Sequence, residues 1–437
     1  MKNIISKLVL VAFLFSFSGT AVARECTTCK KSTAKQSALQ SKAAVCKRAQ
    51  STAELNVNNV RALINAYGNM WFDGSVTQYH LPKNSNSTPL YCAALWIGGT
   101  DVNGQLRIAA LCFGSYGDDY WPGPLDLQTA YVDREICNKY DKHFIITKSE
   151  VLAFKNMFNY TYDPITNQIT GAVPNPDTYD EAAISQTIKD WPAHGEGKQS
   201  KYLAPFCDVD GDMVYDWHKG DYPYYDFDND LCPRTYKSKH PYASSFTAPT
   251  METQDGIVAG GNMSDQVLKG DQTIWWVFND MGNTHTETNG QPIGMEIRAQ
   301  AFAFSTNDEI NNMTFYSYEI INRSTYTLKN TYFSQWVDPD LGDATDDFVG
   351  CDVKRGLGYC YNGNATDGPG TGRYSGIPPA VGIDFFQGPY MDPDGKDNPK
   401  LDFEKLHANA RYEAMLESYK KMDSNGRYVG VLRLWAP

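Results

Sequence analysis

The sequence holds 437 residues and carries a formal net charge of -12. This length leaves room for two or three domains and a sizeable core. The acidic balance argues against nucleic acid as a partner, because binding to phosphates depends on clustered Lys and Arg side chains. The many glycine, asparagine, aspartate and tyrosine residues are typical of a turn-rich β protein.

The first 23 residues have the pattern of a secretory signal peptide. Lys2 and Lys7 precede an apolar stretch at 8–17, and small residues at 21–23 form a cleavage site. The apolar stretch is too short to span a bilayer, and the mature chain has no transmembrane segment by this criterion. We therefore expect an exported protein, extracellular or at the outer cell surface, or periplasmic if the chain lacks a sorting domain.

A basic linker is expected at 24–54, followed by a first β-rich unit at 55–142. Within this unit, strands at 90–97 and 106–113 flank a turn at 98–104 that contains Asn103-Gly104, a strong hairpin signal. A helical insert is expected at 143–200. It begins with a capping box formed by Thr147 and Glu150, and a second helix at 180–190 ends at Trp191-Pro192.

An acidic-loop and main β-meander domain is expected at 201–398, with strands at 273–279, 293–305, 313–322 and 326–338. A helical tail at 399–437, with its helix at about 403–422, closes the chain. The predicted fold is mainly β: antiparallel sheets in β-sandwich-like units, with a short helical insert and a C-terminal helix.

All ten cysteines follow the cleavage site, and an even number in an exported chain favours disulfides. Proximity in sequence suggests three pairs: Cys92 with Cys112, Cys207 with Cys232, and Cys351 with Cys360. The Cys26-x-x-Cys29 motif is interpreted as a disulfide or as terminal thiols, because no βαβ pattern surrounds it.

The strongest chemical motif is an acidic loop that begins at Asp208. Aspartates occupy its positions 1, 3, 5 and 9, the spacing of oxygen ligands in calcium loops; they are Asp208, Asp210, Asp212 and Asp216. Asp221 is a further candidate ligand. The loop departs from an EF-hand at two positions: Met213 stands at position 6, which normally needs a glycine with a left-handed backbone, and Lys219 stands at position 12. A solvated acidic turn is the alternative.

Two more acidic stretches are candidate metal sites with less regular spacing. Crowded carboxylates repel one another unless they hold a cation or face water. The first stretch contains Asp338, Asp340, Asp343, Asp346, Asp347 and Asp352; the second contains Asp392, Asp394, Asp397 and Asn398.

Catalytic signatures are scarce. The sequence has no HExxH, GxSxG or GxxxxGK[ST] motif. Glu296 and Glu319 lie on neighbouring predicted strands, where a glycosidase places its two carboxylates, but pairing with Arg298 is the simpler interpretation. His285 is interpreted as a satisfied loop histidine. Trp121 and Trp217 lie in predicted loops and are the candidates for stacking on a polysaccharide or contacting a protein ligand.

Several phrases resemble the N-terminal part of large exported Bacteroidota proteins of the type IX secretion cargo kind, a family with no assigned reaction. They are NNVRA at 58–62, LWIGG at 95–99, WPGPLD at 121–126, WPAHG at 191–195, APF at 204–206, DVDGD at 208–212, GDQ at 270–272, WWVFND at 275–280, DPDLG at 338–342 and VGCD at 349–352. The resemblance covers roughly 55–398. It implies export, but relatives carry glycine where Met213 stands and end in a β-sandwich sorting domain that has no room here after Leu401.

These observations favour a secreted or cell-surface structural, adhesive or binding protein with calcium-stabilised loops, and an enzyme is the less favoured interpretation. The alternative is a secreted hydrolase that acts on polysaccharide or protein through a carboxylate pair. A third interpretation is a nonfunctional fragment of a longer gene.

Overall fold

The structure is a computed structural model that describes residues 46–113, 117–165, 168–225, 227, 232, 267–352 and 356–384. The predicted signal peptide, the Cys26-x-x-Cys29 motif, the acidic stretch at 392–398 and the predicted C-terminal helix lie outside these residues. Among the described residues, no helix is long and apolar enough to cross a membrane.

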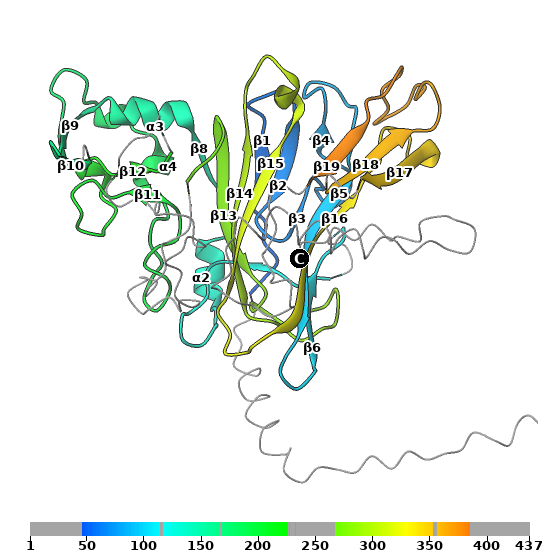
Figure 1. The fold of residues 1–437 in the computed structure, drawn as a ribbon, viewed down its shortest axis with the longest axis horizontal. Helices are drawn as coiled ribbons and strands as arrows, with labels where there is room; N and C mark the ends of the chain where they lie inside the picture. Colours follow the sequence, from blue (N-terminus) through cyan, green and yellow to red (C-terminus); the bar gives the residue numbers. More distant parts are fainter. Residues whose placement is uncertain are drawn as a thin grey trace, which may run out of the picture. The chain divides into compact units, whose positions relative to one another are not determined.

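Antiparallel sheets dominate, which confirms the predicted mainly β fold (Figure 1). A seven-stranded sheet has the order β1-β2-β3-β5-β16, with β4 on β2 and β6 on β5. Its strands are β1 (Thr52–Leu55), β2 (Arg61–Asn65), β3 (Asn69–Met70), β4 (Tyr79–His80), β5 (Cys92–Thr100), β6 (Leu106–Ala110) and β16 (Lys329–Asp338). A five-stranded sheet has the order β15-β14-β13-β7, with β8 on β13. It contains β7 (Trp121–Pro122), β8 (Phe144–Thr147), β13 (Gln272–Asn279), β14 (Met295–Ala303) and β15 (Phe315–Asn322).

Strand β13 lies between two hydrophobic cores, and every residue in it is buried. Ile274, Trp276 and Phe278 pack in the first core with residues of β1, β2 and β5. Trp275 and Val277 point to the opposite face and pack in the second core with residues of the insert. Burial on both faces explains why the strand is a nearly continuous apolar run.

The last predicted meander strand does not stay with the other three. Strands β13, β14 and β15 are successive neighbours, but β16 crosses to β5, with Trp336 opposite Ala94. Trp336 also stacks on Trp96, with ring centroids 6.0 Å apart. The first β-rich unit and the main meander, predicted as separate, therefore share one sheet. Strand β1 likewise begins within the predicted linker at 24–54, and the inward-facing Ala53 and Leu55 make it part of the sheet.

The insert is less helical than predicted. The capping box is present on α3 (Lys148–Lys155): Glu150 N donates to Thr147, and Thr147 N donates to Glu150. The expected helix at 180–190 is broken into η1 (Glu181–Ala183) and α4 (Gln186–Lys189), because Ser185 caps a new start at Ile188 N. Elements that the sequence did not suggest are α2 (Arg134–Lys139), β9 (Phe158–Tyr162), β10 (Ile169–Pro174), β11 (Phe206–Cys207), η2 (Trp217–Lys219) and β12 (Tyr222–Pro223).

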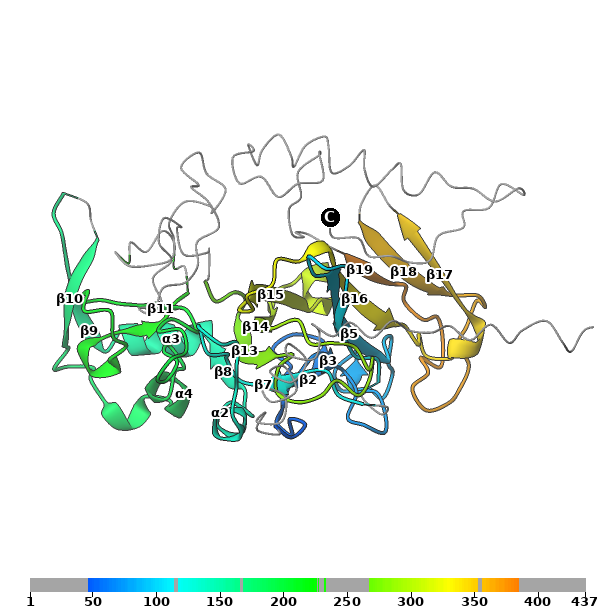
Figure 2. The same ribbon diagram turned by 90° about the horizontal axis from the view of Figure 1, so that it is seen from below.

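A three-stranded sheet follows β16 and carries the acidic stretch at its start. It contains β17 (Asp347–Asp352), β18 (Leu357–Asn362) and β19 (Val381–Asp384), which lie side by side in Figure 2. Val381 and Ile383 pack against the first core. Two further short helices are η3 (Glu309–Asn312) and η4 (Ala344–Asp346).

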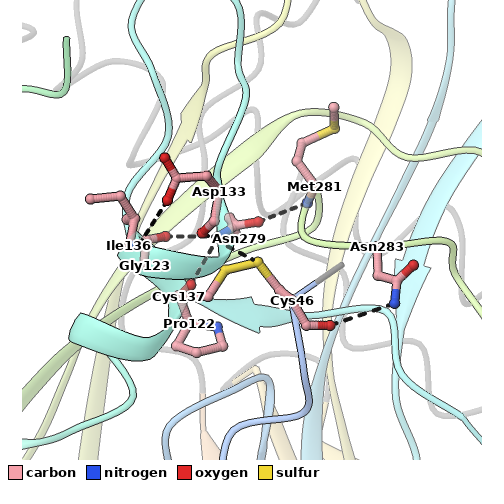
Figure 3. The surroundings of a disulfide bond; sticks show 9 residues. All are labelled: Cys46, Pro122, Gly123, Asp133, Ile136, Cys137, Asn279, Met281 and Asn283. Atoms are coloured by element: carbon pink, nitrogen blue, oxygen red, sulfur yellow. Dashed lines mark hydrogen bonds between the residues drawn. A yellow bond between two sulfur atoms is a disulfide. The ribbon is translucent and has the colours of Figure 1, made fainter. Parts of the chain in front are cut away.

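The disulfides agree with the sequence only in part. Cys207–Cys232 forms as predicted. Cys46 bonds to Cys137, 91 residues away, beside a helix start where Ile136 N donates to Asp133 (Figure 3). The other two predicted pairs do not form: Cys92, Cys112, Cys351 and Cys360 are free thiols. Cys92 Sγ instead lies 3.3 Å from the carbonyl oxygen of Cys112.

Candidate metal centres

Two groups of carboxylates among the described residues are close enough to hold a metal ion. Site I consists of Asp208, Asp210 and Asp212, and site II consists of Asp343, Asp346 and Asp367. In each site the ligand oxygens lie within 4.8 Å of one another. The aspartate spacing predicts a metal in both loops but does not mark Asp367 as a ligand.

Site I is a tightly turned loop held by its own aspartates. Asp208 is buried and accepts hydrogen bonds from Gly211 N at 2.7 Å and Met213 N at 2.9 Å. Cys207, which directly precedes Asp208, is held by its disulfide with Cys232. Met213 has φ +66°, so the left-handed backbone expected of glycine at position 6 is present with a methionine. The loop therefore keeps the calcium-loop backbone at a cost in strain.

The ammonium group of Lys219 already contacts two of the site I carboxylates. Its Nζ lies 2.8 Å from Asp210 Oδ2 and 2.5 Å from Asp212 Oδ2. These contacts raise the pKa of Lys219 and lower that of Asp212. Position 12, where an EF-hand places its bidentate glutamate, thus supplies a cation instead of a ligand.

Asp216 and Asp221 are not part of the site I group. Asp216 Oδ1 faces His218 Nδ1 at 2.9 Å. Asp221 is fully buried beneath the loop, where its two oxygens accept from Val209 N at 2.7 Å and Asp216 N at 2.8 Å. Burial raises the pKa of Asp221 to about 7, against the opposing effect of these backbone bonds. Its position makes it a brace for the loop backbone.

Site II is assembled from two loops that are brought together by β17 and β18. Asp367 is buried and accepts from Asp343 N at 3.0 Å and Tyr374 N at 2.5 Å. Gly342 has φ +74°, and a Cβ there would lie 2.1 Å from Asp367 Oδ2. Only glycine fits at this point, so the close approach of Asp367 depends on it. Arg373 pairs with the Asp343 carboxylate at 2.5 Å.

Three buried side-chain oxygens beside site II have no hydrogen-bond partner among the described residues: Asp346 Oδ1, Asp347 Oδ1 and Asn362 Oδ1. Their companion atoms are engaged. Asp346 Oδ2 accepts from Asn362 Nδ2 at 3.1 Å, and Asp347 Oδ2 accepts from Leu341 N at 2.8 Å. A buried acceptor without a donor is costly, and a cation satisfies such oxygens directly.

The other predicted ligands of this stretch lie beside site II. Burial raises the pKa of Asp340 to about 6, with further contributions from Asp338 and Asp347. Burial also raises the pKa of Asp338 and of Asp347. Asp338 and Asp347 therefore repel the Asp340 carboxylate. Asp352 lies at the far end of β17, away from the group.

Glu296 and Glu319, the predicted carboxylate pair, belong to a network of ion pairs with arginine side chains. Glu296 is fully buried, and its carboxylate contacts Arg298 at 2.9 Å, Arg323 at 3.0 Å and Leu125 N at 2.9 Å. Burial alone would raise its pKa, but Arg323 and Arg298 lower the pKa to about 2. Arg298 also contacts Glu319, which lies opposite it on β15. Glu296 is thus ionised at neutral pH and is poorly suited to give a proton to a leaving group.

His285 is a buried residue with both ring nitrogens in contact with backbone oxygens, in agreement with its interpretation from sequence as a satisfied loop histidine. Its Nδ1 lies 2.8 Å from the carbonyl oxygen of Ile108, and its Nε2 lies 2.7 Å from that of Asp280. Both nitrogens therefore face carbonyl oxygens. The carboxylates of Asp119 and Asp280 lie 3.6 and 3.9 Å from the ring nitrogens.

The two candidate tryptophans differ from expectation. Trp121 is only 2% exposed and packs in a small core beside the Cys46–Cys137 disulfide, so its ring is not at the surface as a loop position would suggest. It lies in the short strand β7, not in a loop. Trp217 is half-buried, and His218 stacks on it with ring centroids 3.5 Å apart.

Comparison with protein families, curated proteins and solved structures finds no match.

Proposed function

We propose that the chain is an exported structural, adhesive or binding module in which one calcium ion at site II closes the acidic loops before the three-stranded sheet. The observation that carries this proposal is the trio of buried, unpartnered oxygens of Asp346, Asp347 and Asn362 next to the site II carboxylates. None of these three oxygens has a hydrogen-bond partner among the described residues, and carboxylate oxygens are concentrated around them.

Calcium suits this set better than the other common cations. It takes six to eight oxygen ligands in flexible geometry, whereas magnesium demands a near-ideal octahedron and zinc prefers histidine and cysteine. The five residues that would supply side-chain oxygens are Asp343, Asp346, Asp347, Asn362 and Asp367. Burial is the main cause of the raised pKa of Asp340 and Asp347, and the ion offsets the smaller contribution from neighbouring carboxylates.

Site I is the weaker candidate, because the Lys219 ammonium contacts two of its three carboxylates, whereas at site II the Arg373 guanidinium contacts only that of Asp343 among the three. This reverses the order that the aspartate spacing suggests. The hydrolase alternative loses support, since Glu296 is saturated by two arginines. Two disulfides support export, because such bonds persist in oxidising compartments.

Thermal unfolding of the oxidised chain from Arg24, with calcium and with a chelator, tests this proposal. We expect calcium to raise the melting temperature by several degrees, because an ion that binds only the folded state stabilises it by mass action. Asp346→Asn should abolish the shift, and Asp177→Asn, which removes an exposed charge elsewhere, should retain it. Equal melting temperatures with calcium and chelator would overturn the proposal.

A further inference from the structure

The three-stranded sheet of β17, β18 and β19 buries few of its residues. Only Gly358 and Cys360 are buried among the residues of its strands, whereas every residue of β13 and β14 is buried. The apolar side chains of Phe348 and Val349 are 57% and 65% exposed. Hydrophobic packing therefore holds this sheet weakly, and such a unit opens at a lower free energy than the core of the protein.

Contacts of two kinds attach this sheet to the seven-stranded sheet, which it adjoins in Figure 1. Val381 and Ile383 of β19 pack against the first core. The second attachment is the buried residue Thr88, in the segment between β4 and β5. Gly342 N donates to Thr88 O at 2.9 Å, and Thr88 N donates to Gly372 O at 2.9 Å. The backbone of Thr88 thus lies between the two loops that form site II.

A site II carboxylate joins the same two loops beside Thr88. Asp367 accepts from Asp343 N at 3.0 Å, next to Gly342, and from Tyr374 N at 2.5 Å in the loop of Gly372. The attachment of the sheet and the candidate metal centre are therefore built from the same backbone segments. A change in the separation of the site II carboxylates changes how the two loops hold Thr88.

The charge at site II sets that separation. The carboxylate oxygens of Asp343, Asp346 and Asp367 lie within 4.8 Å of one another. Arg373 balances part of this charge through its contact with Asp343. The remaining carboxylates repel one another unless a cation lies between them. A bound cation therefore draws the two loops together, and its loss weakens their hold on the seven-stranded sheet.

We propose that calcium at site II controls the docking of the three-stranded sheet on the seven-stranded sheet. With the ion bound, the two loops hold Thr88 and the three-stranded sheet stays closed. Without the ion, this sheet opens more often while the seven- and five-stranded sheets stay folded, and the buried Cys360 thiol becomes accessible. This inference rests on the proposed function and adds the segment that site II regulates.

Alkylation of the full oxidised chain by iodoacetamide, followed for each cysteine by mass spectrometry, tests the inference. Cys360 is a buried thiol of the three-stranded sheet, Cys351 is an exposed thiol of the same sheet, and Cys92 is buried in β5. We expect calcium at a hundred times its Kd to slow alkylation of Cys360 about a hundredfold, because an ion that binds only the closed state lowers the open population by that factor. Cys351 should react equally with calcium and with chelator, and Cys92 should react slowly in both.

Two variants separate the bound ion from other effects of calcium. In Asp346→Asn, which removes a site II ligand, Cys360 should react equally with calcium and with chelator. Asp177→Asn, which removes an exposed charge elsewhere, should keep the difference. Equal melting temperatures of the two variants in chelator show that both are folded. A nearby cation favours the thiolate and speeds alkylation, so a slower reaction in calcium reports access to Cys360.

Equal alkylation rates of Cys360 with calcium and with chelator, in a chain to which calorimetry shows that calcium binds, would overturn the inference and leave the proposed function standing. Parallel changes of Cys360 and Cys92 would also overturn it, because the whole fold would then open together. Absence of calcium binding would overturn the proposed function and the inference with it.

Discussion

The Nζ atom of Lys219 lies 2.5 Å from Asp212 Oδ2, where the calcium-loop spacing leads one to expect a metal ion. The same ammonium contacts Asp210 Oδ2 at 2.8 Å. In a loop with the aspartate pattern of a calcium site, the Lys219 ammonium thus occupies the place of the metal ion at two of the carboxylates. This contact explains why site II, with less regular spacing, is the better candidate.

Replacing Lys219 should open site I to calcium. In Lys219→Met, Asp210 and Asp212 lose their cation, so we expect lower stability in chelator and one additional calcium bound per chain. Calorimetric titration gives the stoichiometry, and Lys189→Met, a lysine outside the loop that lies over Trp217, is the control. An unchanged stoichiometry in Lys219→Met would show that the loop cannot bind calcium even when its ammonium is removed.

At position 213, glycine should give a more stable protein than alanine. Its left-handed backbone costs a non-glycine residue about 1–2 kcal/mol, whereas glycine loses about 0.5–1 kcal/mol through extra freedom in the unfolded chain. Both substitutions remove the packing of Met213 on the second core. We therefore expect Met213→Gly to be more stable than Met213→Ala by about 1 kcal/mol in urea unfolding. The opposite order would mean that the strain has been misassigned.

Gly342 should tolerate no side chain. The Cβ of alanine would enter the Asp367 carboxylate, and the positive φ adds about 1–2 kcal/mol of strain. We expect Gly342→Ala to lower the free energy of unfolding by at least that amount and to weaken calcium binding. Gly74→Ala is the control, because Gly74 also has positive φ but no atom lies within 4 Å of its Cβ position. Calcium binding weakened equally by both variants would disconnect Gly342 from site II.

His143 should make the fold acid-sensitive. Burial lowers its pKa from 6.5 to about 4, and its Nδ1 contacts Ser51 Oγ at 3.0 Å. Between these two pH values the unfolded chain binds a proton that the folded chain does not, so stability falls as pH decreases from 6.5 to 4. The loss approaches about 3 kcal/mol at the lower end. Urea unfolding at several pH values should show a smaller loss in His143→Phe; an equal loss would assign the acid sensitivity to other groups.

The sequence predicted much of the fold because burial leaves a direct pattern. The apolar runs of β13 and β14 and the Asn103-Gly104 hairpin signal correspond to paired strands. Strand β16 was placed correctly along the chain but in the wrong sheet, since alternation along a strand does not identify its partner. Cys46 and Cys137 are too far apart in sequence for proximity to pair them.

For the candidate metal centres, the sequence predicted which stretches are rich in aspartate but not which side chains come together. Spacing identifies carboxylates that can converge, but it does not reveal that Lys219 reaches two of them. Asp367 follows a threonine in a glycine-rich turn, with no neighbouring acid to mark it. Its role depends on the approach to Gly342, which only the fold creates. In the sequence, Tyr359 and Tyr361 look like ordinary strand residues, and only the pairing of β17 with β18 shows that both lie on the exposed face.

Calorimetric titration of the oxidised chain with calcium distinguishes site II from site I. We expect one calcium per chain, bound at site II, with binding lost in Asp346→Asn and in Asp367→Asn and retained in Asp210→Asn and Asp177→Asn. Absence of binding at millimolar calcium would show that site II is not a calcium site, and so would binding that Asp210→Asn removes and Asp346→Asn does not.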